Sequence, residues 1–144
     1  MSITISSTLL QEIHSHGENA YPEEGAGLLL GTASGQDKVV TDILTLENSR
    51  AASARYNRYL LTAEDYLYAE NEATRRDLDV LGVFHSHPDH PNQPSEFDRE
   101  WAMPWFSYII TSVHAGQAKA SRSWCLTDDR SRFDEETLSA ADPL

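Results

Sequence analysis

Apolar residues occur along this chain in short runs with two different periods, which predicts a fold of strands and helices. Runs rich in Val, Ile, Leu and aromatic residues, bounded by Gly, Asn, Asp or Pro, favour β-strands. Strands are predicted over residues 2–5, 27–31, 38–46, 56–61, 79–84, 108–113 and 117–126, with the first at a sheet edge. Parallel and antiparallel pairing are both expected, so the sheet should be mixed.

Other segments carry helix signals instead. Ser6 or Ser7 can cap a helix that has apolar residues at 9, 10 and 13 and ends near residue 17. Residues 62–65, TAED, form a capping box that opens a helix to about residue 76. A short helix should follow from Ser95 to about residue 102, because Pro104 cannot continue it. Near residues 133–138 we expect a last helical turn.

The length and charge of the chain restrict its function. Its 144 residues suit one domain, placed at 1–126, followed by an acidic, partly ordered C-terminal extension at 127–144. A formal charge of −12 and a pI near 4.7 disfavour nucleic acids and acidic membrane surfaces as partners. The single cysteine, Cys125, excludes an intrachain disulfide and should be a small buried hydrophobe. Together with an N-terminus that lacks signal-peptide features, it indicates the reducing cytoplasm.

The segment 82–98, GVFHSHPDHPNQPSEFD, concentrates the residues that could perform chemistry. His85 and His87 occupy alternate positions at the end of a predicted strand, so both imidazoles should project from one face. Ser86, between them, should face the other side and pack there or bond to the backbone. Three prolines then force an ordered loop, and Asp98 lies one turn inside the next helix. Two imidazoles and one carboxylate are the three protein ligands of a catalytic zinc site with an open fourth position.

A structural interpretation of the same residues stays open. Ser95 followed three residues later by Asp98 is also a capping box, in which each side chain accepts from the other residue's backbone N–H. The two roles are compatible, since a capping serine can still direct its hydroxyl at a ligand. The remaining histidines are expected to be exposed or satisfied by hydrogen bonds, outside the ligand spacing: His14, His16, His90 and His114.

The spacing of these residues resembles a family motif. The tetrapeptide HSHP at 85–88 is followed by Ser95, with seven residues between His87 and Ser95, and then by Asp98, with two residues between. This spacing resembles the JAMM motif of MPN-domain metalloproteases. In that family a glutamate in a Pro-x-Glu-x-(Cys or Ala)-Gly segment completes the site. Residues 22–27, PEEGAG, match this segment with Glu24 in register, and an apolar run follows. The resemblance extends from about residue 3 to about residue 126.

This resemblance implies a fold and a set of site residues. The fold is α/β, a single-domain α/β/α sandwich with a mixed sheet, the cytidine-deaminase-like architecture of MPN domains. His85, His87 and Asp98 would hold one Zn²⁺ per chain. Glu24 would act as the general base, and Ser95 would stabilise the oxyanion without being a nucleophile. Many members carry Cys where this chain has Ala26, so a thiol role is absent at that position.

The resemblance also implies a substrate class. MPN metalloproteases hydrolyse the amide bond after the C-terminal Gly-Gly of a ubiquitin-like or sulfur-carrier protein, and this chain has the compact form of prokaryotic members. Residues 47–60 and the turn at 104–106 are candidates for holding the extended tail. The competing hypotheses are a non-catalytic MPN scaffold and a zinc deaminase, which needs more than one cysteine. The sequence leaves a homodimer open.

Overall fold

The computed structural model of the chain describes residues 1–46 and 61–140. Its strands are β1 (Ser2–Ile5), β2 (Ala26–Ser34), β3 (Asp37–Leu46), β4 (Asp79–Pro88), β5 (Ser107–His114), β6 (Gln117–Leu126) and β7 (Phe133–Ala140). Its helices are α1 (Ser7–Ala20), α3 (Ala63–Arg75) and α4 (Glu96–Trp101). Residues 47–60, one of the candidates for holding a substrate tail, and with them nearly all of the strand predicted over 56–61, lie outside the described residues.

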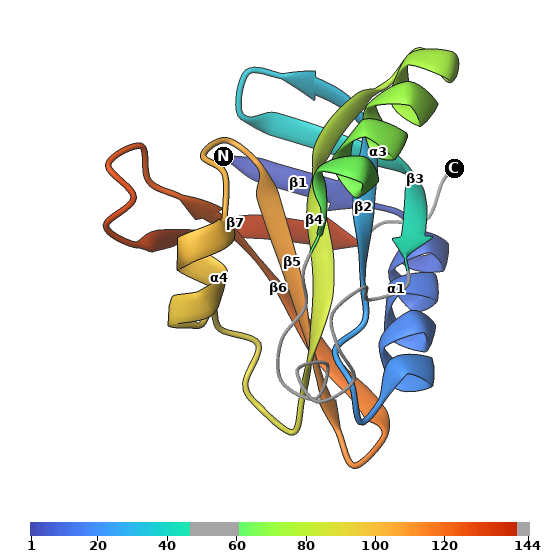
Figure 1. Cartoon of the computed structure of the whole chain (residues 1–144), viewed down its shortest axis with the longest axis vertical. Coiled ribbons are helices and arrows are strands. Elements are labelled where there is room, and N and C mark those ends of the chain that lie inside the picture. The colour runs from blue at the N-terminus through green and yellow to red at the C-terminus, as the bar shows by residue number, and fades with distance from the viewer. Residues whose placement is uncertain (47–60, 141–144) are drawn as a thin grey trace.

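The strands form one curled sheet in the order β1-β3-β2-β4-β5-β6-β7, and β1 also pairs with β7 to close it (Figure 1). The β1–β3, β1–β7 and β4–β5 pairs are parallel, and the other pairs are antiparallel. The mixed sheet is therefore confirmed, but the edge position predicted for residues 2–5 is wrong. Their second neighbour, β7, lies in a segment where no strand was predicted.

Helices cover both faces of the central strands. Ala69 and Ala73 of α3 pack with Leu28 and Leu30 of β2 in one buried cluster. Ile13 of α1 belongs to a second cluster, which contains Leu29 of the same strand. Because side chains alternate along a strand, the two helices lie on opposite faces. This arrangement confirms the α/β/α expectation.

The capping residues predicted for two helices are present at their N-termini. Ser6 caps α1 by accepting a hydrogen bond from the Leu9 N–H at 3.1 Å. The capping box of α3 has both of its bonds, at 3.1 Å to the Thr62 hydroxyl and 2.8 Å to the Asp65 carboxylate. No helix in residues 1–46 and 61–140 is long and apolar enough to cross a membrane.

The segment after β6 differs from the prediction. Residues 133–140 form strand β7, so the helical turn expected near 133–138 is wrong. The buried Glu136 accepts a hydrogen bond from the Ser123 hydroxyl of β6 at 2.7 Å. Arg130 donates to the backbone carbonyls of Arg99, Glu100 and Ala102, at 3.0, 3.1 and 2.7 Å. Residues beyond 126 thus support both the sheet and the end of α4.

Candidate functional site

Strand β4 presents the two histidines at its C-terminal end. His85 and His87 are buried and share a face, and their Nε2 atoms lie 3.2 Å apart. β4 can lie close to β5 because Gly82 has no side chain, since a Cβ there would come within 1.9 Å of the Ser107 carbonyl oxygen. The strand continues through His87 to Pro88, farther than the predicted end at residue 84. This close pairing with β5 fixes the position of the backbone that carries both imidazoles.

The proline-rich loop after β4 is anchored to the β5–β6 hairpin. The Asp89 N–H donates to the Val113 carbonyl at 2.7 Å, and the Ser112 hydroxyl donates to the His90 carbonyl at 2.8 Å. Asn92 donates through its amide to the Ala120 carbonyl at 2.9 Å and accepts at its own carbonyl from the Trp124 indole at 3.0 Å. These hydrogen bonds to β5 and to β6 make the loop a fixed connection between the histidines and α4.

Helix α4 returns a carboxylate to the histidines. Its N-cap, Ser95, accepts from the Asp98 N–H at 3.1 Å, and Asp98 Oδ2 accepts from the Ser95 N–H at 2.8 Å. The same carboxylate lies 3.2 Å from His87 Nε2 through Oδ2 and 3.3 Å from His85 Nε2 through Oδ1. The capping box and the proximity to the histidines therefore coexist, as the sequence allowed.

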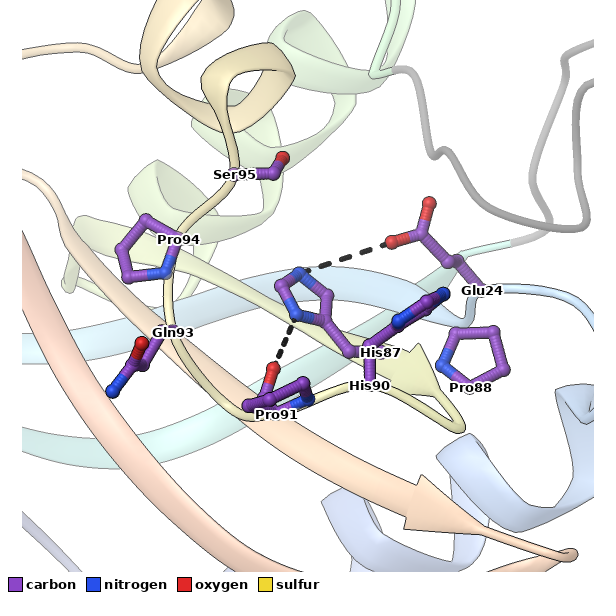
Figure 2. Close-up of a pocket in the computed structure, with 8 residues that line it drawn as sticks. All are labelled: Glu24, His87, Pro88, His90, Pro91, Gln93, Pro94 and Ser95. Atoms are coloured by element: carbon purple, nitrogen blue, oxygen red, sulfur yellow. Dashed lines mark hydrogen bonds and ion pairs between the residues drawn. The ribbon is translucent and has the colours of Figure 1, made fainter.

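Glu24 lies just ahead of β2 and close to His87. Its side chain is buried, and Oε1 is 4.0 Å from His87 Nε2 (Figure 2). The backbone of this segment is held by β4 through Gly25 and Ser86, and Tyr21 donates its phenol to Asp89 at 2.6 Å. The structure therefore brings all four residues predicted around the metal into one buried cluster.

Two overlapping sets of side chains in this cluster could hold a metal. Glu24, His85 and His87 offer ligand atoms that all lie within 4.8 Å of one another. Asp98 and the two imidazoles are closer, with contacts of 3.2 to 3.3 Å. Three ligands bound tetrahedrally at zinc distances would be separated by about 3.3 Å. The spacing of the donor atoms favours Asp98 as the carboxylate ligand and leaves Glu24 as a neighbour.

The protonation preferences of the cluster suit a metal but also admit a proton. Burial lowers the pKa of the His85 imidazole, which favours its neutral form. Burial opposes ionisation of Asp98, but the His85 and His87 imidazoles outweigh it and hold the carboxyl pKa well below its usual range. Although burial disfavours the charged form of His87, contact with Asp98 raises its pKa. A proton and a metal would therefore compete at this imidazole.

The direction of the His87 ring is set by the loop. Its Nδ1 lies 2.8 Å from the Pro91 carbonyl oxygen, and a carbonyl can only accept (Figure 2). Nδ1 therefore carries the hydrogen, and the Nε2 lone pair of the neutral ring faces the cluster. Backbone partners of this kind orient metal-binding histidines in many proteins. Sequence reasoning missed this contact, because no side-chain pattern marks a carbonyl as a partner.

A cavity of about 360 Å³ opens over the cluster. In Figure 2, Glu24 and Ser95 lie on opposite sides of the view, with the His87 ring between them. The rest of the cavity lining comes from the loop: Pro88, His90, Pro91, Gln93 and Pro94. Ser95 is exposed at the rim, so its hydroxyl hydrogen can reach a group placed in the cavity. The arrangement places the buried Asp98–His87 pair, the candidate metal ligands and the Ser95 hydroxyl around one accessible cavity.

The remaining histidines and Cys125 lie outside the cluster, and most of the histidines are hydrogen-bonded or exposed as expected. His14 Nε2 is 2.9 Å from the Ser121 hydroxyl, and His16 Nε2 is 3.1 Å from the Ala26 carbonyl. His114 is exposed, 3.7 Å from Asp89. His90 lines the cavity, but its ring is outside both candidate ligand sets. Cys125 is buried as predicted. The roles of the four clustered residues and of Ser95 remain predictions.

Comparison with solved structures shows the same fold in other prokaryotic proteins. A protein from Salinibacter ruber is 44% identical, with 97% of this chain and 92% of that chain covered and a TM-score of 0.75. One from Desulfitobacterium hafniense is 28% identical, with 99% and 94% covered and a TM-score of 0.85. A JAB1/MPN domain protein from Archaeoglobus fulgidus is 19% identical, with 94% and 95% covered and a TM-score of 0.58. At that identity the last comparison shows the fold alone.

Sequence comparison gives the family. A curated relative from Thermus thermophilus carries the name "Probable TtuB-protein conjugate cleaving protease"; it is 29% identical over 110 residues, which cover 74% of this chain and 70% of the relative. The family model described as prokaryotic homologs of the JAB domain matches residues 6–127. This chain is therefore a member of the prokaryotic JAB-domain family, within the wider JAB/MPN group.

Proposed function

We propose that this protein is a zinc-dependent metalloprotease of the JAMM type that hydrolyses an amide or isopeptide bond. The observation that carries the proposal is the contact of the Asp98 carboxylate with both imidazoles, 3.2 Å from His87 Nε2 and 3.3 Å from His85 Nε2. The buried Glu24 carboxylate lies beside them, 4.0 Å from His87 Nε2. Three close ligands with an open side are the ligand set of a catalytic zinc site, whereas structural zinc sites have four protein ligands.

In this proposal His85, His87 and Asp98 hold the zinc ion. When bound there, the metal would lower the pKa of a coordinated water to about 7 and polarise the scissile carbonyl. Asp98 would bind in its ionised form, which its depressed pKa supports. The Ser95 N–H and the Pro91 carbonyl would keep Asp98 and His87 oriented.

Glu24 serves as the general base and then as the general acid. Its carboxylate faces the cluster at a distance that suits a proton acceptor next to the ligand sphere better than a ligand. It accepts a proton from the attacking water as the new carbon–oxygen bond forms, and it returns that proton to the amine as the carbon–nitrogen bond breaks. Glu24 therefore carries one proton from the attacking water to the leaving amine and ends the reaction in its starting ionised form.

Ser95 stabilises the negative charge on the carbonyl oxygen during the attack. Its oxygen already accepts the Asp98 N–H, which leaves its hydroxyl hydrogen available to donate into the cavity. None of the hydrogen bonds to its oxygen comes from a histidine or a carboxylate in the described residues, so a nucleophilic role has no support.

The family and the named relative support a proposal for the substrate class. We propose that the bond cleaved follows the C-terminal Gly-Gly of a ubiquitin-like or sulfur-carrier protein, since the Thermus thermophilus relative is named for cleaving protein conjugates. A flexible glycine tail could enter the open cavity, where a bulkier segment would meet the proline loop. The single cysteine suits a cytoplasmic location for such an enzyme.

The test is hydrolysis of ubiquitin-fold proteins extended beyond Gly-Gly by an amide-linked amine, followed by mass spectrometry. Wild-type protein should release the amine in a reaction that a chelator stops and zinc restores. Glu24→Gln should abolish release, while Glu23→Gln, the neighbouring and less buried glutamate, should retain it. Release by the Glu24→Gln variant at the wild-type rate would contradict the assignment, and binding of the carrier without any release would favour a non-catalytic scaffold.

A further inference from the structure

Ser86 lies between the two histidines of β4 but faces the opposite side of the strand, and the proposed chemistry gives it no role. It is buried, with 3% of its surface exposed. Its hydroxyl oxygen accepts a hydrogen bond from the Gly25 N–H at 2.8 Å. Its own N–H donates to the Gly25 carbonyl at 3.0 Å. One residue therefore holds both backbone polar groups of Gly25, the direct neighbour of Glu24.

These two bonds mark the point where the Glu24 segment leaves the sheet. Strand β2 begins at Ala26, which pairs with His85 in the antiparallel ladder. One step farther, the Gly25 N–H is directed to the Ser86 hydroxyl, where a regular ladder would use a backbone carbonyl. The serine side chain thus spans the gap that opens as the chain turns away towards Glu24.

The Gly25–Ser86 bonds attach the proposed base, Glu24, to the same short piece of backbone that carries the two imidazoles. His85 and His87 flank Ser86 directly, so any movement of Gly25 relative to Ser86 is a movement of Glu24 relative to both rings. The held amide belongs to the peptide bond that joins Glu24 to Gly25, so it lies directly beside the residue whose carboxylate is 4.0 Å from His87 Nε2. Misplacement of a reacting group by about 1 Å can cost an enzyme on the order of 100-fold in rate.

The surroundings of Ser86 leave little room for a substitute partner. Helix α1 passes close to it at Gly17, where a Cβ would lie 3.1 Å from both Ser86 Cβ and Val113 Cγ2. A water molecule needs space and two or more polar partners. If the hydroxyl were removed, the Gly25 N–H would therefore lose its acceptor without easy replacement.

We infer that Ser86 is a positioning residue: its hydroxyl and backbone N–H clamp Gly25 and thereby set the distance of the Glu24 carboxylate from the histidine pair. The inference depends on the proposed role of Glu24 as the base. It predicts that the hydroxyl affects the rate of the chemical step more than zinc binding or substrate affinity, because both of these are supplied by other residues.

The test compares Ser86→Ala with Thr111→Val. Thr111 pairs with Ser86 in register on β5 and is also buried. Its hydroxyl lies 2.6 Å from the Ser121 hydroxyl of β6, so the substitution to valine removes a buried hydroxyl contact that does not involve Gly25. Ser86→Ala should lower kcat by roughly 10- to 100-fold at nearly unchanged KM and zinc content. Thr111→Val should leave kcat and KM near their wild-type values despite a similar loss of thermal stability.

A second readout does not depend on activity. Amide hydrogen exchange by NMR should show the Gly25 N–H protected in the wild type and in Thr111→Val, and exchanging at least about tenfold faster in Ser86→Ala. Unchanged kcat in Ser86→Ala, or unchanged protection of Gly25, would overturn the clamp. Failure of the proposed function is distinguishable, because then Glu24→Gln would also leave turnover unchanged.

Discussion

Replacing Ser95 by alanine should separate the two functions of its hydroxyl, one structural and one catalytic. As the N-cap of α4, the hydroxyl accepts from the Asp98 N–H at 3.1 Å. Loss of such a cap costs about 1 kcal/mol, and in a domain of this size this lowers Tm by roughly 2–4 °C. The reciprocal bond, from the Ser95 N–H to the Asp98 carboxylate, survives the substitution, so zinc content should be unchanged.

The catalytic part of the loss should be larger than the structural part. Removal of a preorganised donor to an oxyanion lowers kcat by about 100- to 1,000-fold in comparable sites. Because Ser95 is exposed at the rim of the cavity, where water competes, we expect a value at the lower end of that range, about 100-fold. Single-turnover hydrolysis of a Gly-Gly conjugate measures this rate directly.

Two matched variants separate the contributions. Thr62→Ala removes the same kind of cap from α3, whose Thr62 and Asp65 form an equivalent capping box away from the cavity. It should lower Tm as much as Ser95→Ala does and leave kcat unchanged. Ser95→Gly should retain most of the capping stability, since glycine is a tolerated N-cap, and still lose the rate. If Ser95→Ala and Ser95→Gly both turn over within about twofold of the wild type, the oxyanion role is refuted.

Further predictions concern the framework of the site. Burial raises the pKa of the Cys125 thiol from 9.0 to about 11, so alkylation at pH 8 should be about 100-fold slower in native than in unfolded protein and should increase up to pH 11; equal rates would contradict this. Gly82→Ala should cost about 3 kcal/mol or more and reduce bound zinc, because its Cβ would press β4 away from Ser107; normal Tm and zinc content would exclude this close packing. Arg130→Ala removes three hydrogen bonds to carbonyls at the end of α4, and it should lower the free energy of unfolding by about 1 kcal/mol at this exposed position, with a lower Tm as the readout. An unchanged Tm would mean that these bonds contribute nothing to stability.

The parts of the fold that local signals specify were predictable from the sequence. The Ser6 cap, the Thr62 capping box and the alternation through His85 and His87 each depend on residues a few positions apart, and each is present in the structure. The convergence of Asp98 on the histidines was predictable for a related reason. A proline-rich connection and a helix start limited where that carboxylate could go.

What was missed depends on partners far apart in the sequence. Phe133–Ala140 reads as a polar tail, and its strand character becomes evident only when β1 and β6 offer backbone partners and Ser123 binds Glu136. Lys38 is similar: it is buried, with its amine 2.8 Å from the Ser107 hydroxyl, while the neighbouring Val39 is 47% exposed. Hydrophobicity alone would orient this strand the other way.

The most direct measurement is the zinc content of purified wild type, Glu24→Gln and Asp98→Asn by elemental analysis. We expect about one zinc per chain in the wild type and in Glu24→Gln, and far less in Asp98→Asn, because the Asp98 carboxylate is the third ligand and Glu24 stands outside the ligand sphere. Zinc retained in Asp98→Asn and lost in Glu24→Gln would contradict this account, since the ion would then be held by Glu24 and the two histidines.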